Sequence, residues 1–363
     1  MANQSLAVKY RPTSFNDMTE QSAIKDILEN QIKTKTFQHG YLFTGPAGTG
    51  KTTSARIFAN MINDGKGNPI EVDAASNSGV DNIRQIIEDA KRKPLDAEYK
   101  IFIVDECHSL SNGAWQALLK TLEEPPKFTI FIFCTTDPQK VPATILSRVQ
   151  RYNFQKISNE GIVKRLNGII LEENREIIED AGGSQDASND IEWAKHEGIS
   201  CIDCDEDALE YIAKVSSGGM RDAITLLDKC LSLSHDVTLE NVLKTIGSED
   251  YTTFITFLSA LESKVKVSAV RIVENVYNSG KDVKQFMKDF AKFILEVEKY
   301  ALYKNFDYIS LPNTLENELE QLIDDSLFDV MDFVVSLNSK IKWENEPKTL
   351  IELSILIYCG KED

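Results

Sequence analysis

Short, unbroken apolar runs mark the first half of the chain. Residues 41–43, 101–104 and 130–134 are consecutive apolar positions, which is typical of parallel strands buried on both faces. Between these runs, residues 19–33 and 80–90 carry apolar side chains three and four positions apart, the spacing of amphipathic helices. Because strands and helices alternate, we predict an α/β domain with a parallel sheet up to about residue 155.

The pattern changes near residue 158, after which only helical spacing is found, as in Phe286, Phe290, Ile294 and Val297. We therefore predict that strands stop there and that three domains follow one another: an α/β domain at 1–157 and helical domains at 158–247 and 248–363. The polar, glycine-containing segment 179–190 predicts an exposed loop.

Composition narrows the class of protein. The 363 residues carry a net charge of −17, which argues against coating nucleic acid with the whole surface but allows a local basic patch. No apolar run is long enough to span a bilayer, and the N-terminus lacks the features of a secretory signal. With six scattered cysteines, these features favour a cytoplasmic protein without a membrane partner.

A phosphate-binding loop of the form G-x-x-x-x-G-K-[ST] stands between a predicted strand and a predicted helix. Its residues are Gly45, Pro46, Ala47, Gly48, Thr49, Gly50, Lys51 and Thr52. Backbone N–H groups of such a loop cradle phosphates, and the helix start that follows, with Thr53, favours negative charge. Lys51 is expected to reach the β- and γ-phosphates, and Thr52 to ligate Mg²⁺. The sequence thus predicts ATP and Mg²⁺ as cofactors.

Two acids, Asp105 and Glu106, follow the apolar run 101–104. Ligands bind at the carboxyl ends of parallel strands, so Asp105 is predicted to hold Mg²⁺ and Glu106 to activate the attacking water. Read with Cys107 and His108, the pair also spells the box of a helicase class. We do not favour that interpretation because no second motor domain is visible.

Three further polar residues are candidates, each with a plain structural alternative. Thr136 ends the next strand and is either a γ-phosphate sensor or a strand-end cap. Arg148 is either a guanidinium that neutralises a transferring phosphoryl group or a surface ion-pair partner. Arg221 begins a helix, where it either reaches a nucleotide between domains or lies on the surface.

Cys201 and Cys204 have the spacing of metal ligands. Two cysteines make half of a structural zinc site, and no distance to Cys230, His196 or His235 is set by the sequence. A pair of reduced thiols is the favoured interpretation.

These motifs together resemble the gamma/tau family of bacterial DNA polymerase III, the AAA+ ATPases of sliding-clamp loaders. The matching stretches are KYRP (9–12), GPAGTGKTTSAR (45–56), VDAASNSGVDNIR (72–84), VDECHSLS (104–111), ALLKTLEEPP (117–126), TTDPQKVPATILSR (135–148) and GGMRDAITLLDK (218–229). They cover most of the first two domains, whereas the third matches weakly. The resemblance implies a five-stranded parallel sheet, a small helical lid and an all-helical collar.

The resemblance also implies roles for single residues. Arg148 would be an arginine finger acting on a neighbouring subunit's ATP, Thr136 the first sensor and Arg221 the second, and Lys51 and Glu106 would complete the catalytic set. Tyr10, Arg11 and Pro12 would line the adenine side. Arg84 matches a position that contacts DNA phosphates, whereas Asn77 and Gly79 stand where some members carry basic residues.

Three departures from the family pattern stand out. Residues 61–70 replace a four-cysteine zinc module, so no zinc is predicted there. Val149 replaces the cysteine after Arg148, a change that should leave the finger intact. The chain ends after the predicted collar, so coupling to helicase and polymerase through a tail is not predicted; a phage- or plasmid-borne origin is our guess.

The resulting hypothesis is an ATPase motor subunit of a clamp loader. Its implied partners are a sliding clamp, primer–template DNA bound through phosphates, and other subunits in a pentameric ring. The alternatives are another AAA+ nucleic-acid machine, such as a helicase loader or branch-migration motor, and a scaffold subunit that does not hydrolyse ATP.

Overall fold

The computed structural model describes residues 4–182, 194, 196–246, 250–306, 309–312, 315–323 and 327–360. The chain divides into two compact units, Met1–Thr238 and Leu239–Asp363. The three-domain division therefore stays a prediction, and most of the predicted loop at 179–190 and residues 247–249 of the second boundary lie outside the described residues.

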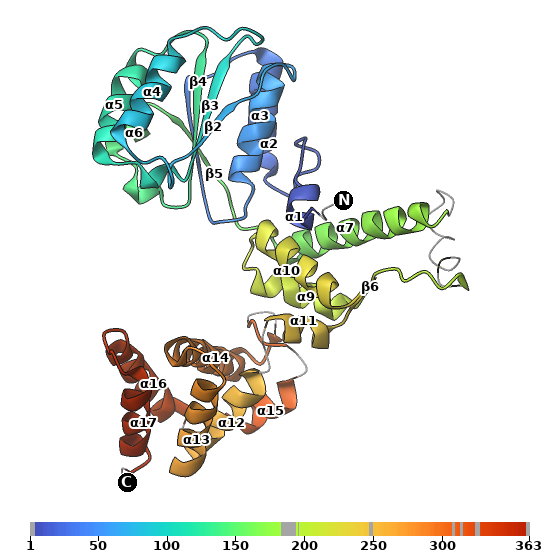
Figure 1. Cartoon of the computed structure of the whole chain (residues 1–363), viewed down its shortest axis with the longest axis vertical. Helices are drawn as coiled ribbons and strands as arrows, with labels where there is room; N and C mark the ends of the chain where they lie inside the picture. The colour runs from blue at the N-terminus through green and yellow to red at the C-terminus, as the bar shows by residue number, and fades with distance from the viewer. Residues whose placement is uncertain are drawn as a thin grey trace. The chain divides into compact units, whose positions relative to one another are not determined.

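A five-stranded sheet forms the centre of the first unit, as predicted (Figure 1). Its order is β2-β3-β4-β1-β5 and every pairing is parallel. The strands are β1 (Gly40–Thr44), β2 (Ile70–Asp73), β3 (Lys100–Asp105), β4 (Thr129–Thr135) and β5 (Gln150–Asn153). All seven residues of β4 are buried, because it lies between β3 and β1 and is covered on both faces.

Helices cover both faces of this sheet. On one face, α2 (Ser22–Thr34) and α3 (Lys51–Ile62) pack against Tyr41 and Phe43 of β1. On the other, Leu42 faces α4 (Val80–Ala90), α5 (Asn112–Glu123) and α6 (Ala143–Leu146) (Figure 1). Successive strand residues point to opposite faces, so each apolar run supplies both cores.

The rest of the first unit is mainly helical. Its elements are α1 (Leu6–Lys9), η1 (Cys107–Ser109), η2 (Pro138–Lys140), α7 (Asn159–Asp180), α9 (Glu206–Val215) and α10 (Met220–Leu233). The Leu6 amide donates to the Asp228 carboxylate at 3.1 Å, and Lys9 pairs with Glu173 at 2.6 Å. These contacts hold the N-terminal segment on α7 and α10.

The prediction that strands stop near residue 158 was wrong in one place. A short parallel pair, β6 (Asp203–Cys204) and β7 (Asp236–Val237), lies beyond it. The buried Asn174 amide stabilises the entry to β6, since its oxygen accepts from the Ile202 N–H at 2.6 Å and its nitrogen donates to the Ile202 carbonyl at 2.8 Å. Two-residue strands are too short to show an alternating pattern.

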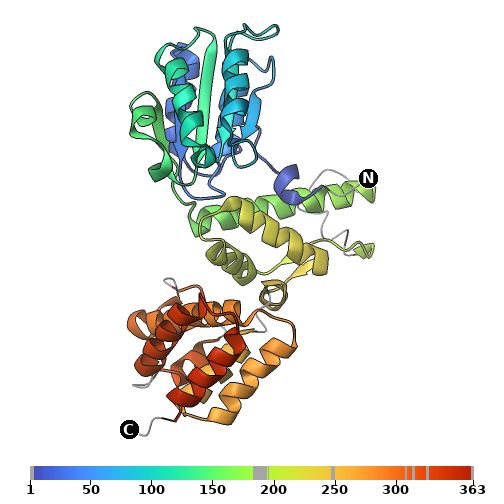
Figure 2. The same cartoon turned by 60° about the vertical axis from the view of Figure 1, so that its left-hand side comes forward.

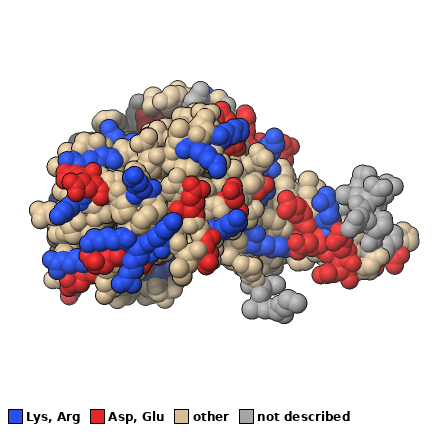
Figure 3. Space-filling view, turned by 90° about the horizontal axis from the view of Figure 1, so that it is seen from above, with Lys and Arg blue, Asp and Glu red and all other residues tan. Residues whose placement is uncertain are grey.

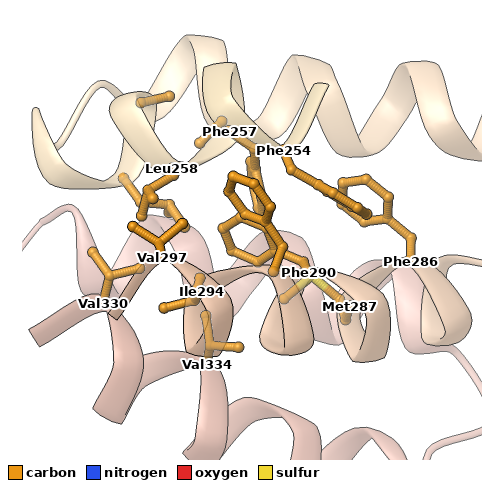
Figure 4. Packing of buried hydrophobic residues seen from close by; sticks show 14 of the residues in the cluster. Phe254, Phe257, Leu258, Phe286, Met287, Phe290, Ile294, Val297, Val330 and Val334 are labelled. Carbon is orange, nitrogen blue, oxygen red and sulfur yellow. The ribbon is translucent and has the colours of Figure 1, made fainter. Parts of the chain in front are cut away.

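The second unit consists of helices in its described residues (Figure 2). They are α11 (Leu239–Ile246), α12 (Asp250–Glu262), α13 (Lys266–Asn278), α14 (Val283–Tyr303), α15 (Glu316–Gln321), α16 (Leu327–Ile341) and α17 (Pro347–Tyr358). The predicted stripe on α14 is buried, and Phe290 meets Phe257 of α12 with ring centroids 4.7 Å apart (Figure 4). No described helix in either unit combines the length and apolarity needed to cross a bilayer.

Phe290→Ala should destabilise the second unit by about 3–5 kcal/mol, because it leaves a cavity among aromatic rings. Hydrogen exchange of α14 amides in the full chain measures this. Phe328→Ala is the control: that side chain is 74% exposed, so its truncation should change stability by less than about 0.5 kcal/mol. Equal effects of the two substitutions would contradict the assigned core.

Candidate nucleotide-binding site

The phosphate-binding loop joins β1 to α3 and has backbone geometry that only glycine adopts readily. Gly45, Gly48 and Gly50 have φ values of +144°, +71° and +97°. A Cβ on Gly48 would lie 2.9 Å from the Gly219 Cα. The loop is therefore closely approached by the start of α10, where the Met220 amide donates to the Gly48 carbonyl at 3.0 Å.

A cavity of about 520 Å³ opens at this loop. Its walls come from the N-terminal segment, the loop with the first turns of α3, the end of β3 and the start of α10. Of the residues predicted to bind ATP, the cavity is lined by Tyr10, Arg11, Pro12, Ala47, Gly48, Thr49, Gly50, Lys51, Thr52, Thr53 and Arg221. Gly45 and Pro46 lie outside this lining, and their carbonyl oxygens instead contact Lys51.

Lys51 is the buried cation of the site, 6% exposed. Its Nζ donates to the carbonyl oxygens of Gly45 at 2.9 Å and Pro46 at 2.7 Å. Burial lowers the pKa of the Lys51 ammonium, while the nearby carboxylates Glu106 and Asp105 act in the opposite direction. A buried ammonium with neutral partners is suited to a phosphate, which would supply the missing negative charge.

Thr52 and Asp105 come together as the sequence predicts for a magnesium site. The Thr52 hydroxyl donates to Asp105 Oδ2 at 2.8 Å. Hydroxyl and carboxylate oxygens are ligands that Mg²⁺ accepts when phosphates and water complete its octahedron. Within the described ranges no cluster of three or more His, Cys, Asp or Glu side chains is arranged around a metal position, so a substrate phosphate would have to share the ion.

Glu106 and Thr136 also meet, although they follow different strands, β3 and β4. Thr136 Oγ1 donates to Glu106 Oε2 at 3.3 Å. A residue that the sequence did not assign joins them: His108 Nδ1 lies 3.3 Å from the same carboxylate oxygen and 3.1 Å from Thr135 Oγ1. The sequence drew attention to His108 only as the last residue of the box Asp105-Glu106-Cys107-His108.

Four arginines line the cavity, and the sequence identified only two of them. Arg56 and Arg165 join Arg11 and Arg221. The pKa of Arg11 is lowered mainly by burial, and the positive charges of Arg56 and Arg221 lower it further. Arg56 is five residues beyond Lys51 on the same helix, a spacing that does not place two side chains on one helix face. The crowding of guanidinium groups favours an anionic ligand.

Arg148 lies outside the cavity lining. Its Nη2 pairs with Glu123 Oε1 at 2.6 Å, and its Nη1 donates to the Thr144 carbonyl at 2.6 Å. The side chain is 33% exposed. Within one subunit, Arg148 is therefore a surface arginine in an ion pair.

The residue predicted to contact DNA and the cysteine pair are not among the residues that line the cavity. Arg84 is exposed on α4 and pairs with Asp81 at 3.0 Å. Figure 3 shows Lys and Arg mixed with Asp and Glu on the face it presents, with acids gathered over the projecting end of α7. Cys204 belongs to β6, and neither Cys201 nor Cys204 takes part in a metal-type cluster among the described residues.

Several known proteins with similar sequences are subunits of DNA polymerase III, in agreement with the resemblance found in the sequence motifs. Residues 70–158 match the family model "DNA polymerase III, delta subunit", and residues 197–236 match "DNA polymerase III clamp loader subunit, ATPase lid domain". The chain is 33% identical to DNA polymerase III subunit tau of Bacillus subtilis, over 99% of this chain and 64% of that protein. It is 32% identical to the gamma/tau subunit of Mycoplasma genitalium, over 83% and 50%.

Two other similarities are to a relative that is covered over most of its length and to a solved structure. The gamma subunit of Buchnera aphidicola is 29% identical, over 82% of this chain and 81% of its own length. Among solved structures, the Thermotoga maritima RuvB Holliday junction branch migration motor aligns with a TM-score of 0.48 and 18% identity, covering 69% of this chain and 79% of that one. At that level the alignment has no bearing on function.

A phosphate loop after β1, an acidic pair after β3 and a matched lid place the chain among the AAA+ ATPases. Within that class it belongs to the DNA polymerase III gamma/tau family. It spans 64% and 50% of the lengths of the first two relatives.

Gly48→Ala should weaken nucleotide binding and lower stability by about 1–3 kcal/mol. The added Cβ forces a left-handed alanine and meets the backbone of Gly219. Gly168→Ala on α7 is the control, since nothing lies within 4 Å of its Cβ position and alanine favours the helix. Thermal unfolding measures the stability and titration with a fluorescent ATP analogue measures the Kd. If Gly48→Ala leaves both unchanged, the close approach of Gly219 to Gly48 would be contradicted.

Proposed function

We propose that this chain is the ATPase motor subunit of a sliding-clamp loader. The observation that carries the ATPase part is that the phosphate loop, Asp105, Glu106 and Arg221 line one cavity. The family relationship supports the clamp-loader part, since the relatives are named as subunits of DNA polymerase III. In this proposal, ATP binding opens the clamp and hydrolysis on primer–template DNA releases it.

The reaction is hydrolysis of ATP to ADP and phosphate. A bond forms between the water oxygen and the γ-phosphorus, while the bond to the β,γ-bridging oxygen breaks and the water proton passes to Glu106. Lys51 would bind the phosphates, and Thr52 and Asp105 would hold Mg²⁺, which neutralises phosphate charge when bound. Thr136 would orient the γ-phosphate or water, and Arg221 would contact the nucleotide from α10.

Arg148 would complete a neighbouring subunit's site. Two features support this: it lies outside its own cavity lining, and it is held at the surface by one carboxylate that a phosphate can replace. This assignment requires other subunits, which we propose form a pentameric ring. Hydrolysis would then depend on correct contact between neighbours.

DNA contact would be local and independent of sequence. The net charge of −17 opposes broad contact with phosphates, so a few positions such as Arg84 would carry it. Breaking the Arg84–Asp81 pair would cost little because both side chains are exposed. The bacterial relatives favour a bacterial cytoplasm as the setting, and a phage- or plasmid-borne origin stays a guess.

Arg148→Ala should retain ATP binding but lose turnover stimulated by DNA, by about a hundredfold or more. The measurement is phosphate release with and without primer–template DNA and the clamp of the same replication system. Arg151→Ala, an exposed arginine on the adjoining β5, is the control and should retain stimulation. Normal turnover in Arg148→Ala would exclude a finger acting in trans, and a rate unaffected by the clamp would favour another AAA+ machine.

Lys51→Ala and Glu106→Gln should separate binding from hydrolysis. Lys51→Ala removes a charge-assisted contact to phosphate and should weaken ATP binding at least about tenfold. Glu106→Gln should bind ATP normally yet hydrolyse it about 100-fold more slowly or worse. Glu124→Gln, an exposed acid after α5, is the control for the charge change. Absence of hydrolysis by the unaltered chain with DNA and clamp would indicate a scaffold subunit.

A further inference from the structure

The turn after β3 contains a histidine with no role in the function proposed above. His108 lies in η1, two residues beyond Glu106, and its side chain is 20% exposed. Its Nδ1 faces two oxygens, Glu106 Oε2 at 3.3 Å and Thr135 Oγ1 at 3.1 Å. These distances place the ring between the acid that follows β3 and the last residue of β4.

The backbone of Glu106 directs its side chain to this place. Glu106 has a left-handed conformation, with φ of +46° and ψ of +42°, which non-glycine residues adopt rarely and which occurs often at functional sites. The same carboxylate oxygen also accepts the Thr136 hydroxyl at 3.3 Å. One oxygen of Glu106 is therefore held from two sides at the end of β4.

The position of one proton decides whether His108 holds the carboxylate. A neutral imidazole carries hydrogen on Nδ1 or on Nε2. With hydrogen on Nδ1, the ring donates toward Glu106 and Thr135. With hydrogen on Nε2, the Nδ1 lone pair faces a negative oxygen and accepts only from the Thr135 hydroxyl. The neighbouring carboxylate favours the Nδ1–H form because that form gives attraction in place of repulsion.

Thr135 is consistent with that form. Its hydroxyl oxygen already accepts from the Asp137 amide at 3.0 Å, and the residue is fully buried. A hydroxyl oxygen has two lone pairs, so it can accept from His108 Nδ1–H as well. The ring thereby connects the acid after β3 to the end of β4.

We propose that His108 is a positioning residue for Glu106: its Nδ1–H and the Thr136 hydroxyl hold one carboxylate oxygen so that the other can take the proton of the attacking water. This inference rests on the proposed ATPase function. It adds a residue outside the cavity lining that acts on the chemical step through Glu106 and leaves nucleotide binding to other groups. Fixing one oxygen pre-organises the base, which is worth more than the modest hydrogen bond itself.

The test compares variants of His108 in the full chain by single-turnover hydrolysis of radiolabelled Mg·ATP, with primer–template DNA and the clamp of the same replication system present. His108→Ala should lower the rate about tenfold while the half-saturating ATP concentration stays within twofold. His108→Asn should recover most of the rate, since its amide N–H takes the place of Nδ1–H. In a Glu106→Gln background, His108→Ala should have less than a twofold further effect because the base is already absent.

His39 offers a matched control. Its Nδ1 contacts the Thr129 carbonyl at 2.8 Å, at the other end of β4, so His39→Ala should leave the rate within twofold. A wild-type rate in His108→Ala would overturn the proposal. So would equal losses in His108→Ala and His108→Asn, or a further large loss in the Glu106→Gln background.

Nitrogen-15 NMR of the His108 ring keeps the test independent of turnover. The proposal expects the Nδ1–H form in the unaltered chain and a shift toward Nε2–H in Glu106→Ala. An Nε2–H ring in the unaltered chain would refute it even if hydrolysis is robust. Conversely, absence of hydrolysis in the unaltered chain would overturn the ATPase function, while the NMR result would still decide whether His108 holds Glu106.

Discussion

The parallel pairing of β1, β3 and β4 is the constraint on which the site depends. Parallel strands end at the same edge of a sheet, and the register pairs Thr44 of β1 with Thr135 of β4. The phosphate loop, the acidic pair, and Thr135 and Thr136 at the end of β4 therefore lie close together although they are far apart in sequence. Each contact that follows, such as Thr52 with Asp105, depends on that shared edge.

Two walls of the cavity, the N-terminal segment and the start of α10, lie outside the sheet. The N-terminal segment is held on α7 and α10 by the Leu6–Asp228 and Lys9–Glu173 contacts. The start of α10 is held on the phosphate loop by the Met220–Gly48 hydrogen bond. All these contacts lie within one compact unit, and the arginines of the N-terminal segment, α3, α7 and α10 line one cavity. Glu71 pairs with Arg56 at 2.6 Å, and a ligand with several negative charges would balance the other guanidinium groups.

Charge is distributed in opposite senses over the molecule and in the site. The chain as a whole carries −17, whereas the cavity is lined by four arginines and a buried lysine beside the acids Asp17, Asp105, Glu106 and Asp222. Such a pocket can attract an anion from a protein that is itself anionic, because nearby charges outweigh distant, screened ones. Arg148 is paired outside the cavity, so any action on phosphate would be directed at another molecule.

The sequence by itself determined the elements and the chemistry carried by contiguous motifs. The apolar runs predicted buried parallel strands, and the phosphate loop and acidic pair stood out because their residues are adjacent in the chain. The two-residue strands β6 and β7 were missed, since pairs that short leave no periodic signal. Arg56, Arg165 and His108 were missed for a different reason. Their place beside the candidate nucleotide site, or beside Glu106, follows from how α3, α7 and the turn after β3 pack around the sheet. Likewise, only the tertiary structure decided that Arg148 is held by Glu123 outside its own cavity lining, because distances between residues remote in sequence are set by packing and not by spacing.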